Sequence, residues 1–568
     1  MSKSDRAWWS GLRNLVSSLR AISGAVDPGI LLVLLLGLAV RLLFFQGFLG
    51  MGAAHDDLFS SKAYDVVQSW KSGAFWAPGD PKDPLALRMG IILPTALSYL
   101  VFGVNEASMA LYPLACSLIS LFLTIYLGTT LFDRHTGLLA GLLLAVFPLD
   151  VLYATVLWPD TPMCTFQLLA LLLLLKGERE GNTGITSPGM LFLAGFSVGL
   201  AYIAKVSGLL IILPMAAYLF NRRARVWAWG WVAVGLLMGF LVETVYLWVA
   251  SGDLLARIRW FNPMRDHGVP IETIPGATDS MQLAGRVLWS FPSMMLVPLN
   301  RKIVYFGLFG WSLVAGAYYL FRHKDSKSFP VLAWWVLLYL GILFLPRGFS
   351  PIHFAHNVKP VYLLPIVYPA ALITARALVL SEDLGRYAKR AGLAVLCVAA
   401  ICGLVMADYA AGRNMAYNSR EIARYLESHP GKPVLVDPGT KTNLEFFLGY
   451  ADRRLVQYDH TPLETVNAGF VVVNESMLHR KLIGYTAPHQ ILNPPDNWER
   501  IEDIRNPAYE RGLFRLIEWF VQTVAQGYAF VSPSGQWGTK QDDRDIKQVF
   551  QDFARPAYIY RVRPPGGS

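Results

Sequence analysis

Cysteine is scarce in this chain of 568 residues: there are four, and all of them lie in apolar segments. None falls in the polar C-terminal third, so the sequence indicates neither a disulfide framework nor a CxxC metal site. That third also lacks the GxGxxG and P-loop signatures, so no nucleotide site is expected there. Basic residues exceed acidic ones by 50 to 40, but they are scattered in short loops, which argues against nucleic acid as a partner.

Long apolar segments dominate the chain instead. Hydrophobic residues make up 54% of it, the mean hydropathy is +0.39, and apolar runs of about 17–25 residues recur. This predicts a polytopic α-helical membrane protein whose surroundings are the lipid bilayer. Ile30–Phe48 is predicted to be an uncleaved first span, because Arg41 interrupts the run and the polar stretch before it is long for a signal peptide.

Clusters of basic residues predict which loops are cytoplasmic, and successive clusters must be separated by an even number of crossings. The clusters are at Arg134, Lys176–Glu180, Asn221–Arg225, Arg322–Lys327 and Gly385–Arg390. The resulting prediction has eleven spans, a cytoplasmic N-terminus and an outer C-terminus. The predicted spans are 30–48, 107–131, 137–155, 161–176, 189–204, 207–221, 226–250, 302–321, 329–346, 360–376 and 391–408.

The same parity decides two ambiguous stretches. Met190–Phe220 is predicted to be a hairpin of two short helices, with Lys205 near its outer tip. Leu85–Gly103 contains Arg88 and a central Pro94, so it is predicted to lie on the outer surface as an interfacial helix rather than to cross.

The last third of the chain has a different pattern, in which short strand-like segments alternate with polar helical ones. It is predicted to be a small extracytoplasmic α/β domain. The predicted division is 1–29 for a cytoplasmic segment, 30–409 for the membrane domain and 410–568 for the α/β domain. The predicted strands are 433–438, 454–459, 469–475, 528–532 and 557–562, with a helix at 419–428.

Adjacent acids follow the first span. Asp56 and Asp57 open a segment with apolar residues at helical spacing, which predicts an amphipathic interfacial helix ending near Gly73. One Asp suffices to cap that helix, so the second, beside His55, is left for another role.

Further outer acids and cations lie in other loops. Asp160 follows the third span, where it either caps the fourth or serves in a site, and Asp83 lies five residues before Arg88. If these loops converge, the four acids form a carboxylate pocket beside Arg88 and Lys205. The outer loops carry positive charges that either pair with acids and lipid headgroups or bind an anionic ligand. These cations are Arg88, Arg257, Arg259, Arg265, Arg347 and Lys359.

Carboxylates beside cations at the outer surface suit the transfer of a sugar from a lipid phosphate. A carboxylate takes the proton of the acceptor, and Lys and Arg stabilise the departing phosphate. The membrane supplies such a donor laterally, so no nucleotide site is needed.

The chain resembles the GT-C membrane glycosyltransferases, particularly the branch of the protein O-mannosyltransferases and the lipid A aminoarabinose transferase. The resemblance covers about residues 30–410 and rests on the order and spacing of several stretches. These are "AVRLLFFQGFLGMGAAHDDLFSSKAYDV", "GVNEASMALYPLACSLISLFLTIYLGTTLFDRHTGLLAGLLLAVFPLDVLYATVLWPDTPM", "GLAYIAKVSGLLIILP" and "KPVYLLPIVYPAAL".

The resemblance implies roles for particular residues. Asp56 would be the leading catalytic base, with Asp57 beside it and Asp160 as a further active-site acid. Arg88, Lys205 and Tyr362 are implied to hold the phosphate, with help from Arg259 or Arg265. Asp83 and Lys359 are further candidates for substrate or phosphate binding, because of their places in the outer loops.

The chain departs from this branch in two places. Asp57 stands where the branch usually has Glu, and Asp83-Pro84 replaces the acid–Lys–Pro stretch of the aminoarabinose transferases, which leaves the sugar and the acceptor open.

The sequence thus predicts an inverting glycosyltransferase of the bacterial cytoplasmic membrane that uses a polyprenyl-phosphate sugar. Its acceptor would be lipid A or another envelope glycan, a lipid or a protein. No cofactor is expected; a divalent metal is compatible with the acids but not favoured. The alternatives are a flippase or transporter for lipid-linked sugars, although no internal repeat is found, and a scaffold whose α/β domain binds a partner.

Overall fold

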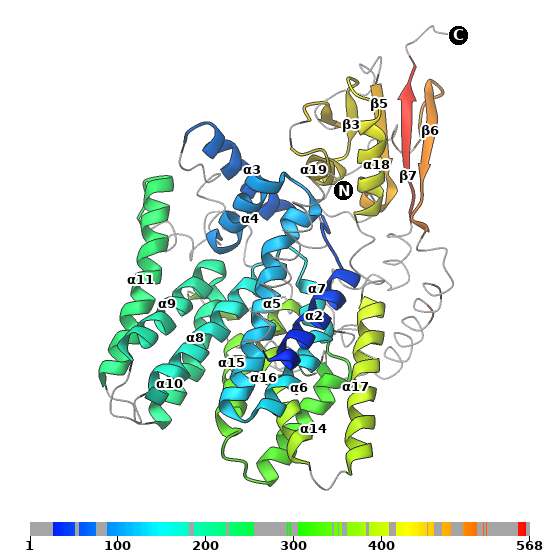
Figure 1. Cartoon of the computed structure of the whole chain (residues 1–568). Helices are drawn as coiled ribbons and strands as arrows, with labels where there is room; N and C mark the ends of the chain where they lie inside the picture. Colours follow the sequence, from blue (N-terminus) through cyan, green and yellow to red (C-terminus); the bar gives the residue numbers. More distant parts are fainter. Residues whose placement is uncertain are drawn as a thin grey trace, which may run out of the picture.

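The computed structural model of the chain joins a helical bundle to a mixed sheet at one end of it (Figure 1). We call this the sheet end of the bundle. The structure describes residues 27–50, 56–74, 88–180, 187–222, 226–254, 305–343, 346–349, 352–354, 360–381, 385–407, 416–450, 452–458, 469–478, 493–507 and 555–563, with 292, 295, 296, 491, 515 and 519.

A helix or a pair of helices lies at each of the eleven predicted spans. Four of the described helices are long and apolar enough to cross a membrane, and five shorter ones are also apolar. The chain is therefore a multi-pass membrane protein, while the number eleven stays a prediction. The bounds are α2 Pro28–Leu43, α5 Glu106–Leu131, α6 Arg134–Ala145, α7 Pro148–Tyr153, α8 Asp160–Glu180, α9 Pro188–Ala204, η2 Val206–Ile211, α10 Ile212–Asn221, α11 Val226–Ser251, α14 Leu308–Arg322, α15 Phe329–Leu343, η5 Pro360–Leu363, α16 Leu364–Leu380 and α17 Arg386–Ala407.

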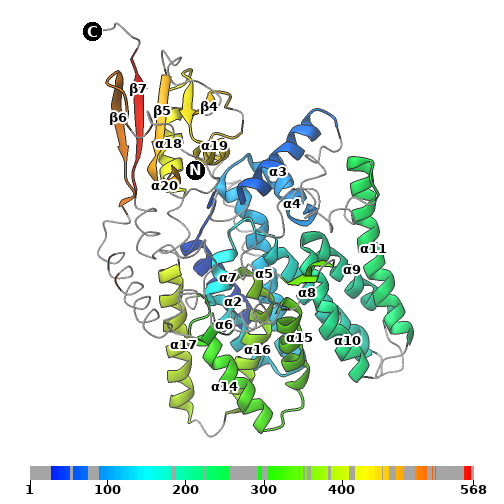
Figure 2. The same cartoon turned by 180° about the vertical axis from the view of Figure 1, so that it is seen from behind.

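Two helices precede α5 at the sheet end (Figure 2). Helix α3 (Asp56–Lys71) begins at the acidic pair and buries Phe59, Ala63 and Val67, the helical spacing that the sequence predicts. Helix α4 (Met89–Phe102) occupies the predicted interfacial segment.

The third predicted span is broken in the structure. Helix α6 ends at Ala145, and α7 begins with Pro148 at its first position, where a missing N–H costs nothing. The chain then leaves α7 and reaches Asp160 as the first residue of α8. The break therefore delivers this acid to the sheet end.

Glycines make the contact between α9 and α11. They are spaced four residues apart on both helices, at Gly195 and Gly199 and at Gly235 and Gly239. A methyl group added to Gly195 would lie 1.9 Å from the carbonyl oxygen of Val232, so the backbones touch directly. Close backbone approach of this kind holds helices together in lipid, where apolar side chains gain little from pairing.

The opposite end of the bundle is fixed by ion pairs between turns. Arg376 on α16 bonds Asp133 before α6 at 2.9 Å and Asp325 before α15 at 3.0 Å. Arg134 pairs with Asp27 at the start of α2. The turns at 133–134 and 325, which carry predicted cytoplasmic basic clusters, therefore lie together, away from the sheet end.

The C-terminal domain contains a five-stranded sheet in the order β4-β3-β5-β7-β6. Strand β3 is parallel to β4 and β5, whereas β7 is antiparallel to β5 and β6. Four predicted strands and the predicted helix are confirmed, and 528–532 lies outside the described residues. The bounds are α18 Tyr417–Glu427, β3 Val434–Val436, α19 Pro438–Phe447, β4 Leu455–Gln457, β5 Gly469–Asn474, α20 Glu475–Leu478, β6 Trp498–Ile504 and β7 Ala557–Val562; a separate hairpin pairs β1 Pro346–Phe349 with β2 Ile352–Phe354.

Candidate functional site

The adjacent acids at the start of α3 are buried, Asp56 completely and Asp57 to 5% exposure. The Leu49 N–H donates to Oδ2 of Asp56 at 2.6 Å, and the N–H groups of Gly50 and Asp57 donate to Oδ1 at 3.2 and 3.1 Å. A carboxylate has about four lone-pair directions, so these three donors fix the group and leave it able to accept one more proton.

Burial changes the pKa values of both acids. It raises the pKa of Asp56 to about 8, the Leu49 N–H opposes the rise, and the charge of Asp57 adds to it. Burial likewise raises the pKa of Asp57 to about 6. The two neighbours thus titrate at different pH values, which is typical of carboxyl groups that take part in proton transfer.

A second cluster joins three residues that the sequence singled out. The Lys205 Nζ donates to both oxygens of Asp160, at 2.7 and 2.8 Å, and lies 4.3 Å from the ring centroid of Tyr362. Asp160 is 1% exposed and the Lys205 side chain 12%. Lys205 occupies the extended break between α9 and η2, as the hairpin prediction requires.

Aromatic and backbone contacts connect the two clusters. The Phe59 ring, one turn after the acidic pair, packs edge-on against Trp158 with centroids 6.4 Å apart. The Arg88 guanidinium lies 5.4 Å from the centroid of the same ring. A methyl group on Gly90 would lie 2.7 Å from Cα of Ala204, so the start of α4 touches the chain next to Lys205. Both acid clusters and Arg88 therefore share the sheet end.

Several predicted site residues lie outside the described part of the chain, and their roles stay predictions. They are Asp83, Arg259, Arg265 and Lys359. Of the four acids of the expected carboxylate pocket, the structure thus describes three: Asp56, Asp57 and Asp160.

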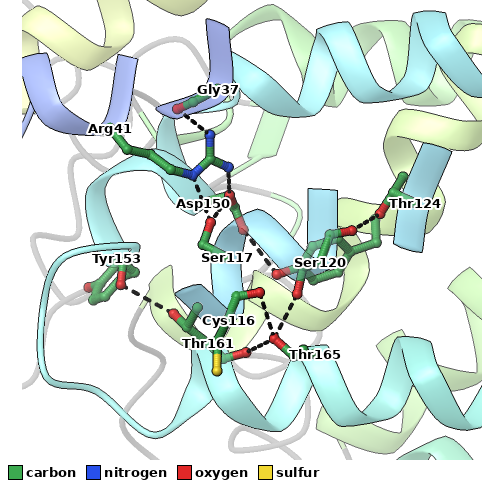
Figure 3. Close-up of polar contacts among 11 residues, drawn as sticks. Gly37, Arg41, Cys116, Ser117, Ser120, Thr124, Asp150, Tyr153, Thr161 and Thr165 are labelled. Carbon is green, nitrogen blue, oxygen red and sulfur yellow. Dashed lines mark hydrogen bonds and ion pairs between the residues drawn. The ribbon is translucent and has the colours of Figure 1, made fainter. Parts of the chain in front are cut away.

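A buried ion pair lies beneath the site, and the sequence had singled out one of its two residues (Figure 3). Arg41 and Asp150 pair with both side chains fully buried, and Ser117 bonds each of them, at 2.7 and 2.9 Å. The Tyr368 hydroxyl donates to the other Asp150 oxygen at 2.9 Å. The sequence marked Arg41 as a charge that interrupts the first apolar run, but it missed Asp150, whose signal was a lone carboxylate inside an apolar run.

This ion-pair network joins α2, α5, α7 and α16, and it stands at the base of two acid-bearing loops. One loop leads from α2 to Asp56, and the other from α7 to Asp160. Above the network the Gln46 N–H donates to the Thr155 hydroxyl at 2.9 Å, which ties the two loops together.

The C-terminal domain packs directly on the site. Phe48, in the loop before the acidic pair, stacks on Phe446 of α19 with centroids 4.1 Å apart. Arg420 of α18 bonds Glu106 at the start of α5 at 2.7 Å. The domain thereby covers the acidic pair and fixes the loop in front of it.

No group of three His, Cys, Asp or Glu side chains suited to a metal ion occurs within the described ranges. Independence from metal therefore stays a prediction.

Residues 91–248 match the family described as dolichyl-phosphate-mannose-protein mannosyltransferase. Over this segment, about 28% of the chain, the sequence is similar to that family. The matched part includes Asp160, Lys205 and most of α4. This mannosyltransferase family match confirms the resemblance expected from the sequence, and with it the class of enzyme: a membrane glycosyltransferase that depends on a lipid-phosphate sugar.

Solved structures share the fold. ArnT from Cupriavidus metallidurans in the apo state is 14% identical with a TM-score of 0.52, over 80% of this chain and 93% of that one. The same protein bound to undecaprenyl phosphate is 14% identical with a TM-score of 0.51, over 78% of this chain and 92% of that one. The Archaeoglobus fulgidus oligosaccharyltransferase in complex with Zn and sulfate is 13% identical with a TM-score of 0.50, over 94% and 88%. No curated protein sequence matches the chain.

Proposed function

We propose that the chain is an inverting glycosyltransferase that moves a sugar from a polyprenyl-phosphate carrier to an acceptor at the outer face of the cytoplasmic membrane. The observation that carries this proposal is the meeting, at one end of the bundle, of a buried acidic pair and the Asp160–Lys205–Tyr362 cluster. One group can take a proton, and the other can hold a phosphate.

In the proposed step Asp56 is the general base. Its carboxylate takes the proton of the acceptor hydroxyl or amine, the acceptor attacks the anomeric carbon, and the bond from that carbon to the phosphate oxygen breaks. Three backbone N–H groups fix its direction. Direct attack without a covalent intermediate inverts the anomeric centre.

Lys205 and Arg88 would stabilise the departing phosphate. Asp160 holds the Lys205 ammonium in place, and the Tyr362 ring flanks it. Preorganised cations in a site that excludes water stabilise developing negative charge more than they would in bulk water. The predicted cations Arg259, Arg265 and Lys359, with Asp83, would complete the phosphate and substrate contacts.

The bound ligand of a structural relative supports a polyprenyl phosphate as the carrier, since ArnT was solved with undecaprenyl phosphate. The acceptor would be lipid A or another envelope glycan, a lipid or a protein. The gathering of two basic turns at the end away from the sheet supports a cytoplasmic N-terminus and a periplasmic C-terminal domain. Residues 1–29, 30–409 and 410–568 would form the three parts of the chain.

Sugar transfer in membranes, with labelled polyprenyl-phosphate sugars, tests the proposal. Asp56→Asn should lower transfer by about 10²-fold or more at normal expression, as expected for a lost general base. Asp160→Asn should also lower it, because Lys205 loses its partner.

Asp65→Asn is the matched control, since Asp65 lies exposed on the same helix α3. It should transfer at the wild-type rate. If Asp56→Asn and Asp160→Asn both kept full activity, the two acids would be helix caps and the general base would lie elsewhere. A wild type that transfers no sugar from any donor would favour the flippase.

A further inference from the structure

Helix α19 of the C-terminal domain ends in a way that places one tyrosine under strain. The Gly449 N–H bonds the Phe446 carbonyl at 3.1 Å, and the Tyr450 N–H bonds the Glu445 carbonyl at 2.5 Å, which is a Schellman ending. Gly449, at φ 77°, supplies the left-handed residue that this ending needs. Tyr450 is also left-handed, at φ 60°, where the motif makes no such demand. A bulky residue in this conformation is a genuine outlier, and such outliers gather at functional sites.

The hydroxyl of Tyr450 is buried and forms no hydrogen bond of good geometry with any described residue. Its neighbour Ser60, on α3, is already bonded to the Tyr99 hydroxyl at 2.6 Å. Burial raises the pKa of the Tyr450 phenol well above its usual value. The nearby Ser60 hydroxyl opposes this rise in pKa, and the charges of Asp57 and Asp56 add to it. An unsatisfied buried hydroxyl beside two carboxyl groups calls for an explanation, because most such groups are paired.

The tyrosine is held rigidly over the start of α3. Its ring packs on Tyr64 with centroids 5.0 Å apart and edge-on against Phe446 at 6.4 Å. Within α19, seven residues before Tyr450, Asn443 lies against Gly50. A methyl group added to Gly50 would come within 2.5 Å of the side-chain oxygen of Asn443. Gly50 is one of the residues that donate to Asp56, so the α19 segment and the acidic pair are fixed relative to one another.

We propose that Tyr450 is a positioning residue for the acceptor, whose polar group its hydroxyl holds beside the acidic pair. The inference rests on the proposed function and deepens it, because it gives the C-terminal domain a part in the site. The acceptor would be a hydroxyl- or amine-bearing molecule. Its proton passes to the carboxylate, its oxygen or nitrogen bonds the anomeric carbon, and the polyprenyl phosphate leaves.

A purely structural role does not explain the hydroxyl. A phenylalanine would make the same ring contacts without a buried polar atom, and Gly or Asn would adopt the left-handed backbone with less strain. Removing the hydroxyl should therefore leave folding intact, which makes Tyr450→Phe a clean test of its function.

The test uses the full-length protein, labelled polyprenyl-phosphate sugars, and membranes from the same organism lacking this chain as the source of acceptor. Transfer is measured against increasing amounts of those membranes, and hydrolysis of the donor by water is measured alongside it. For Tyr450→Phe we expect the amount of membrane needed for half-maximal transfer to rise at least about tenfold, the size of effect that one lost hydrogen bond to substrate gives. Hydrolysis and the thermal unfolding midpoint should stay at or above the wild-type values.

Tyr458→Phe is the matched control in the same domain. The Tyr458 hydroxyl bonds the Val472 carbonyl inside the sheet, so its loss should lower the unfolding midpoint and leave the transfer curve unchanged. An unchanged transfer curve for Tyr450→Phe, with active wild type, overturns the inference and leaves the proposed function standing. A parallel loss of hydrolysis also overturns it, because the defect would then not concern the acceptor. A wild type that labels no membrane component overturns the proposed function, and this inference with it.

Discussion

The pH dependence of sugar transfer distinguishes the two acids of the pair. Asp56 has a pKa of about 8 and Asp57 a pKa of about 6. A general base works only when it has lost its proton, so its activity is present above its pKa and lost as the pH falls through that value. With Asp56 as the base, kcat/KM should rise about tenfold from pH 7 to pH 9. With Asp57 in that role the rate would already be near its plateau at pH 7 and would fall about tenfold by pH 5.

The variants sharpen this prediction. The charge of Asp57 raises the pKa of Asp56, so Asp57→Asn should move the pH profile toward lower pH. Asp56→Asn should lose transfer at every pH, whereas Asp65→Asn should follow the wild-type curve.

The assay is initial-rate transfer from a labelled polyprenyl-phosphate sugar at low donor concentration, between pH 5 and 9. The donor is a phosphodiester and does not titrate in this range, so an inflection belongs to the enzyme or the acceptor. An inflection near 6 that disappears in Asp57→Asn would refute Asp56 as the base. A flat profile would refute the assignment of either acid.

Three further outcomes are expected. Lys205→Met leaves Asp160 buried without its partner, so it should lower the free energy of unfolding in detergent by about 3 kcal/mol. The same variant should slow transfer by about 10²-fold. Wild-type stability of this variant would show that the pair is not buried. Arg41→Met should cost about 3–5 kcal/mol of stability, and adding Asp150→Asn should recover much of this by removing the unpaired charge; a double variant as unstable as the single would contradict the pairing. Transfer should persist at full rate after dialysis against a strong chelator, and a loss that added zinc or magnesium restores would refute the predicted independence from metal.

Local features of the sequence predicted most of the elements. Apolar length located the helices, and the spacing of Phe59, Ala63 and Val67 located α3. Strand β6 was not predicted, because at the edge of the sheet it alternates charged residues such as Glu499 with inward ones, a pattern that resembles a polar loop.

Partners distant in the sequence were harder to predict. The sequence could place Lys205 near Asp160, since both lie where helices reach the outer surface. The Arg41–Asp150 pair and the role of Tyr450 were not, because each depends on how segments far apart in the chain pack together. Charge and periodicity predict whether a residue is buried and whether it requires a charged partner. Which residue is that partner depends on tertiary packing.

The buried arginine of α2 also bears on how the chain enters the membrane. Arg41 is made 109 residues before its partner Asp150, so the first helix must insert while its guanidinium has no counter-charge. An arginine in a helix near the bilayer centre costs about 2.5–3.5 kcal/mol on the insertion scale, and the cost is smaller near a helix end, from which the side chain can reach the headgroups. Arg41 lies in the last turn of α2, where that escape exists. During biogenesis the first helix would therefore insert with its arginine directed to the lipid surface, and would draw it inward only once α7 has followed.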